Sequence, residues 1–123
     1  MSSSLEQITR DRQDANALFR SKRVAEARER YTQLLDELER VRPHVITPED
    51  PNPPAEWTTE RVAVLSNRAA CWLQEGENQA CIDDCTSILD VQGDHRKALF
   101  RRATVCDFEK TADRNAWIYV SLT

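Results

Sequence analysis

The sequence has little of what interrupts helices. Glycine occurs 2 times in 123 residues, and the 5 prolines all lie between residues 43 and 54. Proline removes a backbone donor and fixes φ, so long stretches without it favour helix. Residues 1–42 and 58–123 are therefore predicted to be helical, which makes the fold class all-α.

A surplus of positive charge and long apolar runs are also missing. The 17 Lys and Arg residues are outnumbered by 21 Asp and Glu, giving a net charge of −4, whereas general nucleic-acid binding needs surplus cations. No apolar run has the length of a bilayer-spanning helix, and residues 1–7 have no apolar signal core. We expect a single domain over residues 1–123 that is cytoplasmic and binds neither nucleic acid nor membrane.

No spacing typical of a catalytic or metal site is found. The 4 cysteines are Cys71, Cys81, Cys85 and Cys106. They lie within helical patterns, so reduced and buried thiols are expected. Cys81 and Cys85 could share a helix face and a metal, but no further ligands follow at zinc-site spacing. His44 and His95 are far apart, and no glycine-rich phosphate loop is present. We expect no enzyme, no cofactor and no metal.

Apolar spacing predicts six helices joined by short turns, apart from one long loop. The expected helices span about 5–20, 24–42, 58–76, 78–91, 95–109 and 112–122. Thr58 or Thr59 is the expected N-cap of the third helix, and Asp94 that of the fifth. The proline-rich stretch is expected to form an extended loop over residues 43–57. This order predicts stacked helical hairpins.

The chain repeats itself with a period of 34 residues. A shift of 34 places residues 67–69 on residues 101–103. Earlier segments align at a separation of 54 residues, which is the same period of 34 plus an insertion of 20. The aligned pairs are Lys22 with Gly76, Ala27 with Cys81 and Tyr31 with Cys85. Small residues at positions 27 and 81 suit a helix packed closely against its hairpin partner.

These segments resemble tetratricopeptide repeats. The stretches ANALFRSKRVAEARERY and VLSNRAACWLQEGENQACIDDCTSIL follow that family's pattern, and HRKALFRRA begins a third repeat whose second helix is degenerate. The resemblance implies a right-handed superhelix of three stacked helix-turn-helix hairpins, whose first helices line a concave groove. Repeat 1 spans about 7–42, repeat 2 about 58–91 and repeat 3 about 94–123. A long proline-rich insertion, 43–57, separates the first two.

Polar residues share faces on the first helices of these repeats. Arg12 and Asn16 are four residues apart, as are Lys97 and Arg101, and Asn67 occupies the position equivalent to Arg101. Cations and amides that converge in one groove suit an anion, and carboxylates fit their hydrogen-bonding geometry. The adjacent Arg68 is expected either to be solvated or to pair with a nearby acid.

This arrangement resembles the dicarboxylate clamp of co-chaperone tetratricopeptide domains, carried here by ANALF, SNRAA and KALFRRA. The resemblance implies a clamp made of Arg12, Asn16, Asn67, Lys97 and Arg101. Its implied partner is the C-terminal Glu-Glu-Val-Asp of cytosolic 70- and 90-kDa heat-shock chaperones. The positions implied for a pocket that takes the peptide's apolar side chain are Phe19, Ala70 and Leu73. Arg12 departs from the family, which usually has Lys there, so contact geometry is expected to differ.

Other interpretations remain open. The degenerate third repeat also suits a scaffold that binds an internal segment of another protein, and equal binding of a peptide and its C-terminal amide would favour that alternative. The sequence ends on an apolar surface without a capping helix, formed by Trp117, Ile118, Val120 and Leu122. Solenoids normally cover such a face. Either the chain continues in a longer protein, or this surface packs on a partner or a second copy.

Overall fold

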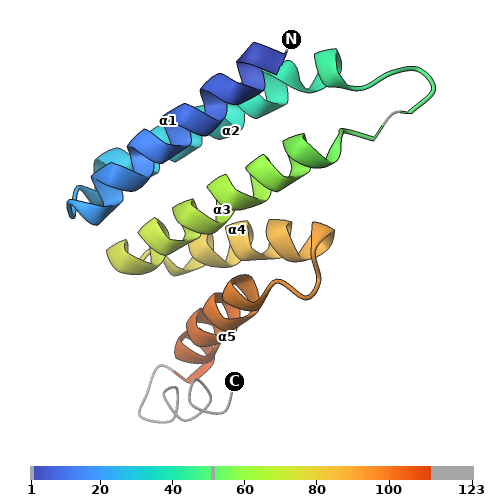
Figure 1. Ribbon diagram of the computed structural model, residues 1–123. Coiled ribbons are helices and arrows are strands. Elements are labelled where there is room, and N and C mark those ends of the chain that lie inside the picture. Colours follow the sequence, from blue (N-terminus) through green and yellow to red (C-terminus); the bar gives the residue numbers. More distant parts are fainter. Residues whose placement is uncertain (1, 51, 112–123) are drawn as a thin grey trace.

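The fold is an array of antiparallel helices. The computed structural model describes residues 2–50 and 52–111, which form five helices and no strand (Figure 1). The helices are α1 (Ser2–Arg20), α2 (Val24–Val45), α3 (Ala55–Glu75), α4 (Asn78–Val91) and α5 (Arg96–Thr111). The all-α prediction is thus confirmed for these residues. The sixth predicted helix and the apolar residues 117–122 lie outside them.

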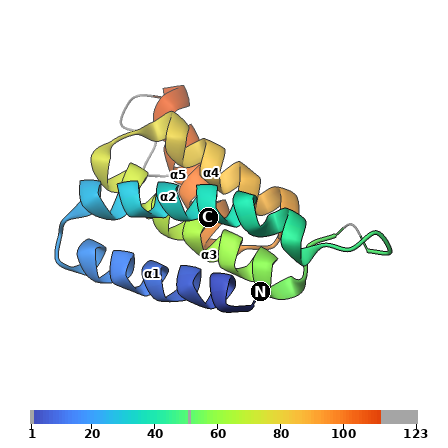
Figure 2. The ribbon, with the colours of Figure 1, turned by 90° about the horizontal axis from the view of Figure 1, so that it is seen from above.

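The helices form two layers. Each helix packs on its neighbours in the sequence, and α3 also contacts α1 and α5. Viewed from above, α1 and α3 lie at one level while α2 and α4 lie at the other (Figure 2). The first helix of each predicted hairpin therefore faces the first helix of the next. None of the described helices has both the length and the apolar character needed to cross a bilayer.

Two turns show the repeat at the level of the backbone. Lys22 and Gly76, 54 residues apart, both adopt the left-handed conformation, with φ of 66° and 76°. In each turn this residue donates its N–H to the carbonyl three residues back, at 3.0 and 3.2 Å. The following residue donates five residues back, at 2.9 Å in both turns. This Schellman pattern closes both helices in the same way, and it agrees with the sequence alignment.

The aligned small residues lie in the core, as predicted. Ala27 and Cys81 are 0% exposed, and so is Cys85. Cys71, Cys81 and Cys85 are free, buried thiols, which agrees with the expectation for these three; the side chain of Cys106 is outside the described part. Burial raises the pKa of Cys71 to about 11.

The loop expected over 43–57 is shorter than predicted, because helix occupies both of its ends. α2 runs on to Val45 with Pro43 in its last turn, and the connection to α3 covers residues 46–54. Proline there loses one helical hydrogen bond at an exposed site. Trp57 is buried and donates from Nε1 to the Leu38 carbonyl at 2.8 Å. Packing between the two helix ends thus outweighs the proline signal.

Most of the extra length between the first two hairpins is helical. When the turns at Lys22 and Gly76 are aligned, residues 38–45 of α2 extend beyond the end of α4, and residues 55–61 of α3 precede the start of α5. The connection between α4 and α5 is short and covers residues 92–95. These additional turns carry buried side chains, including Leu38, Trp57 and Glu60. Residues 38–45 and 55–61 therefore add to the core, and the second stretch also contributes a buried carboxylate.

Both predicted N-caps are wrong. α3 begins at Ala55 after Pro54, without a side-chain cap, because the buried Trp57 draws the helix start upstream of Thr58 and Thr59. At α5 the backbone N–H of Ala98 donates to His95 Nδ1 at 3.2 Å. The cap is therefore the imidazole of His95 and not the carboxylate of Asp94.

Candidate functional site

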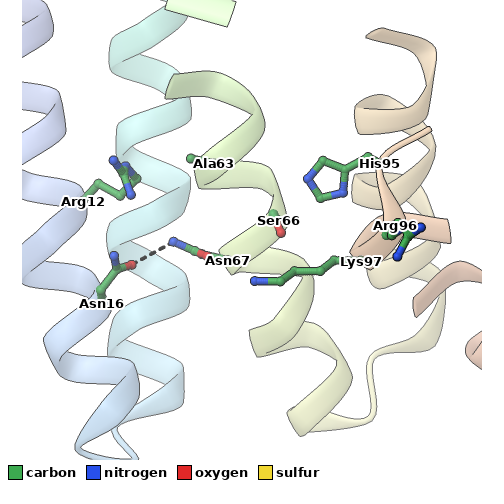
Figure 3. Close-up of a pocket in the computed structure, with 8 residues that line it drawn as sticks. All are labelled: Arg12, Asn16, Ala63, Ser66, Asn67, His95, Arg96 and Lys97. Carbon is green, nitrogen blue, oxygen red and sulfur yellow. Dashed lines mark hydrogen bonds between the residues drawn. The ribbon is translucent and has the colours of Figure 1, made fainter. Parts of the chain in front are cut away.

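A polar cavity of about 440 Å³ lies between α1, α3 and α5 (Figure 3). Its lining residues are Arg12, Asn16, Ala63, Ser66, Asn67, His95, Arg96 and Lys97. Three of these side chains are cationic, none is a carboxylate, and Ala63 alone is apolar. The structure thus brings together four of the five predicted clamp residues, Arg12, Asn16, Asn67 and Lys97, around one space. Surplus positive charge and amide groups in a concave site suit an anionic ligand.

Asn16 and Asn67 form a bridge across the cavity wall between α1 and α3. The Nδ2 of Asn67 donates to Oδ1 of Asn16 at 2.8 Å, and the hydroxyl of Tyr31 donates to the same oxygen. With its oxygen occupied twice, the Asn16 amide is fixed, and its Nδ2 has no hydrogen-bond partner among the described residues. It remains available as a donor for a ligand.

Tyr31 is a site residue that the sequence did not identify, because it was assigned only to the repeat pattern. The side chain is 1% exposed, and burial raises the pKa of Tyr31 to about 12. The hydroxyl is therefore a neutral, permanent donor at ordinary pH. It fixes Asn16 from α2, a helix that contributes no residue to the cavity lining itself.

Arg12 is held by a buried carboxylate that the prediction also missed. Its Nε donates to Oε2 of Glu60, and the Oγ1 of Thr9 donates to Oε1 of Glu60 at 2.8 Å. Glu60 is only 7% exposed. Arg12 is thus paired before any ligand arrives. No sequence signal marks this pair, since it depends on α3 beginning early enough to bury Glu60 against α1.

The third wall of the cavity comes from the start of α5. Lys97 extends toward Asn67, and the ring of His95 also projects into the cavity (Figure 3). Lys97 is exposed and forms no ion pair with any described residue. His95 accepts a hydrogen bond at Nδ1, so the neutral ring carries its proton on Nε2. Arg96 also lines the cavity, but its guanidinium turns away from Asn16.

Arg101, the fifth predicted clamp residue, lies beside the cavity and does not line it. Its Nη1 donates to the carbonyl and to Oγ of Ser66, at 2.8 and 3.0 Å. Ser66 itself lines the cavity. In this structure Arg101 therefore fastens α5 to α3 next to the cavity, and its other guanidinium nitrogens have no partner among the described residues.

The three residues predicted to form an apolar pocket do not line this cavity. Phe19 is partly buried against the core between α1 and α2. Ala70 is half-buried, and Leu73 is 37% exposed near the end of α3. All three lie toward the C-terminal ends of α1 and α3, beyond the Asn16–Asn67 bridge.

A second polar cluster occupies the opposite side of α3. Arg68 donates from Nε and Nη2 to the two carboxylate oxygens of Asp84, at 2.8 and 2.6 Å. Its Nη1 donates to Oγ1 of Thr32 at 3.2 Å, and Trp72 Nε1 donates to Asp84 at 3.0 Å. Asp84 is 4% exposed. The choice left open by the sequence is settled: Arg68 is paired, within a network that joins α2, α3 and α4.

Comparisons with known proteins give partial matches. The chain is 33% identical to Sperm-associated antigen 1A of Danio rerio over 96 residues, which are 78% of this chain and 20% of that protein. It is 36% identical to Sperm-associated antigen 1 of Rattus norvegicus over 89 residues, 72% of this chain and 8% of that protein. It is 47% identical to Mitochondrial import receptor subunit TOM34 of Rattus norvegicus over 45 residues, which are 37% of this chain and 15% of that protein.

No family model matches the chain. The chain spans a fifth or less of the length of each of these relatives. It is therefore similar to one segment of longer proteins. The match to the antigen proteins covers most of the five-helix array.

Proposed function

We propose that this chain is a tetratricopeptide-type module, a right-handed superhelix of helical hairpins, that binds the free C-terminus of another protein. The cavity between α1, α3 and α5 receives the paired carboxylates of a terminal Asp. The proposed ligand is the C-terminal Glu-Glu-Val-Asp of cytosolic 70- or 90-kDa heat-shock chaperones. The chain would then serve as a co-chaperone or adaptor domain.

One observation supports this proposal above the others. Arg12, Asn16, Asn67 and Lys97 come from three helices and line one cavity that contains no carboxylate of its own. Ammonium, guanidinium and amide donors together suit a dicarboxylate, whose oxygens accept several hydrogen bonds at once. In the proposal Asn16, Asn67 and Lys97 bind the terminal carboxylates, Arg12 shares the terminal one, and Arg101 reaches an oxygen further back.

The relatives favour a protein ligand. One of them is named as a subunit of a mitochondrial import receptor. The matches to the sperm-associated antigen proteins cover 78% and 72% of this chain. The apolar contact at Phe19, Ala70 and Leu73 belongs to the same proposal, because a peptide that ends in the cavity and runs along α1 and α3 reaches them.

The test is a comparison of one peptide in two chemical forms. A fluorescent peptide ending in Glu-Glu-Val-Asp should bind as the free acid, and its C-terminal amide should bind at least about tenfold more weakly, because one charged acceptor is lost. Raising the salt concentration should weaken the free acid further. Equal binding of acid and amide would contradict the proposal and favour recognition of an internal segment.

A substitution in the cavity makes the test specific. Lys97→Ala should lower the affinity for the free acid by about tenfold or more, since a charge-assisted hydrogen bond is removed. The side chain is exposed and forms no ion pair with any described residue, so the free energy of unfolding should be unchanged within about 0.5 kcal/mol. Lys22→Ala, in the turn after α1 and away from the cavity, is the matched loss of one lysine and should leave the affinity unchanged.

A further inference from the structure

The Arg12–Glu60 pair is an unusual feature for a cavity wall that is proposed to bind carboxylates. Glu60 brings its own carboxylate to Arg12, yet it is 7% exposed and does not line the cavity. Thr9 and Arg12, three residues apart on one face of α1, each engage one oxygen of this carboxylate. Both acceptor atoms are therefore committed, and the group is fixed in one orientation.

The chemistry of arginine decides what this pair leaves available. A guanidinium has three nitrogens in a rigid plane, so Nε can hold one carboxylate while the Nη atoms donate to another. In this structure Nε is the atom that donates to Glu60. The Nη atoms of Arg12 have no hydrogen-bond partner among the described residues. Lysine has a single ammonium, which would be drawn to Glu60 and away from the cavity.

The lengthened α3 explains why Glu60 is there. Residues 55–61 are the additional turns at the start of α3, which follow from the extra length between the first two hairpins. Glu60 lies in these turns, opposite Thr9 and Arg12 of α1. Residues 55–61 thus contribute Glu60, which acts on the cavity through Arg12 although it does not line the cavity itself.

We infer that Glu60 is a positioning residue for ligand binding: it anchors Arg12 through Nε so that the Nη atoms donate to the ligand carboxylate. This inference rests on the proposed function. It makes residues 12 and 60 interdependent, because arginine is the better residue at position 12 only while Glu60 holds it.

A double-mutant cycle on the intact chain tests this interdependence. The variants are Arg12→Lys, Glu60→Gln and both together, and the measurement is the affinity for the free-acid Glu-Glu-Val-Asp peptide. Arg12→Lys alone should weaken binding about tenfold, the size of one lost charged hydrogen bond. In the Glu60→Gln background the same change should cost less than about twofold, because the ammonium is then released to the cavity.

A matched control is present in the same fold. Arg28 donates from Nε to Oε1 of Glu75 at 2.7 Å, between α2 and α3 and away from the cavity. It is also an arginine–glutamate pair that uses Nε across a similar sequence separation, but it is more exposed, and its Nη2 donates to Oε2 of Glu75 at 3.5 Å. Arg28→Lys should leave peptide affinity unchanged, alone and with Glu75→Gln. Thermal unfolding of every variant, followed by circular dichroism, shows that each is folded at the assay temperature.

The outcomes separate this inference from the proposed function. Free-acid binding with coupling between positions 12 and 60 supports both. Free-acid binding with equal costs of Arg12→Lys in the two backgrounds overturns the positioning role and leaves the proposed function standing. If the unaltered chain does not prefer the acid over the amide, both fall. Should Glu60→Gln unfold, Glu60→Met is the second variant: it removes the carboxylate at a similar side-chain length, and an unchanged cost of Arg12→Lys in that background would also overturn the inference.

Discussion

Asn67 and Arg68 are adjacent in the sequence but belong to opposite sides of α3. Asn67 faces α1 and α5, donates to Asn16 and lines the cavity. Arg68 faces α2 and α4, where Asp84 and Thr32 accept hydrogen bonds from all three of its guanidinium nitrogens. Both interrupt an otherwise apolar segment. On the cavity side the Nδ2 of Asn16 has no partner among the described residues, whereas on the other side every guanidinium nitrogen of Arg68 is hydrogen-bonded.

The difference shows how a buried polar group can serve either stability or binding. A guanidinium whose three nitrogens are all hydrogen-bonded inside the protein is held in place by the fold, and removing it leaves a buried carboxylate without its charge partner. Donors that face a cavity with some of their capacity unused add little to stability but are ready to bind. The two sides of α3 should therefore respond to mutation in opposite ways.

The largest effect is expected on the packed side. Arg68→Met should lower the free energy of unfolding by about 3 kcal/mol, because it leaves Asp84 buried without its partner. Chemical denaturation measures this, and the peptide affinity of the folded protein should change little. Glu26→Ala, which breaks the exposed pair with Arg23, is the control and should stay within about 0.5 kcal/mol. A loss below about 1 kcal/mol for Arg68→Met would remove the contrast between the two sides.

Alkaline pH should also lower the stability of the packed interior. Burial raises the pKa of Cys71 from 9.0 to about 11, so above pH 9 the unfolded chain loses this proton before the folded chain does. Stability that is complete below pH 9 should fall as the pH rises to 11, by up to about 1.4 kcal/mol per pH unit from this thiol. Denaturant titrations at pH 8 to 11 measure the slope. Cys71→Ala should make it shallower; an unchanged slope would contradict the assignment.

On the cavity side, Asn67→Ala should reverse the pattern seen for Arg68. We expect about a tenfold loss of affinity for the free-acid peptide, because one ligand donor is lost and Asn16 loses a partner that orients it. The unfolding free energy should change by less than about 1 kcal/mol. Fluorescence anisotropy and denaturation on the same samples compare the two. A larger effect on stability than on binding would place Asn67 with the packed side.

The smallest effect is expected where the two sides meet. Tyr31 reaches from the packed layer and donates to the Asn16 amide at the cavity. Tyr31→Phe keeps the ring but frees Asn16 to rotate, so affinity should fall by about threefold and stability by about 1 kcal/mol. Leu34→Met, a near-isosteric change in the same buried cluster, should alter stability slightly and leave affinity unchanged. If Tyr31→Phe lowers stability without weakening peptide affinity, Tyr31 has no role in ligand binding.

Local signals in the sequence were sufficient for much of the fold. The boundaries of α4, the turns at Lys22 and Gly76 and the buried positions 27 and 81 follow from spacing, from glycine and from the 34-residue period. The helix ends at Val45 and Ala55 did not follow, because they depend on Trp57 packing across onto Leu38. The cap at His95 was missed because a carboxylate cap from Asp94 was expected, whereas the imidazole of His95 accepts the hydrogen bond.

The helical character of the chain, the repetition of its hairpins and the polar residues that share helix faces could all be inferred from sequence spacing, because they depend on neighbours within a few residues. What each polar residue contacts could not be inferred in this way. The tertiary structure brought Glu60 to Arg12 and Tyr31 to Asn16, set Arg101 on Ser66, and turned Arg68 away from the cavity. These contacts join residues 15 to 48 positions apart, and hydrogen bonding at that range is fixed by how the helices pack.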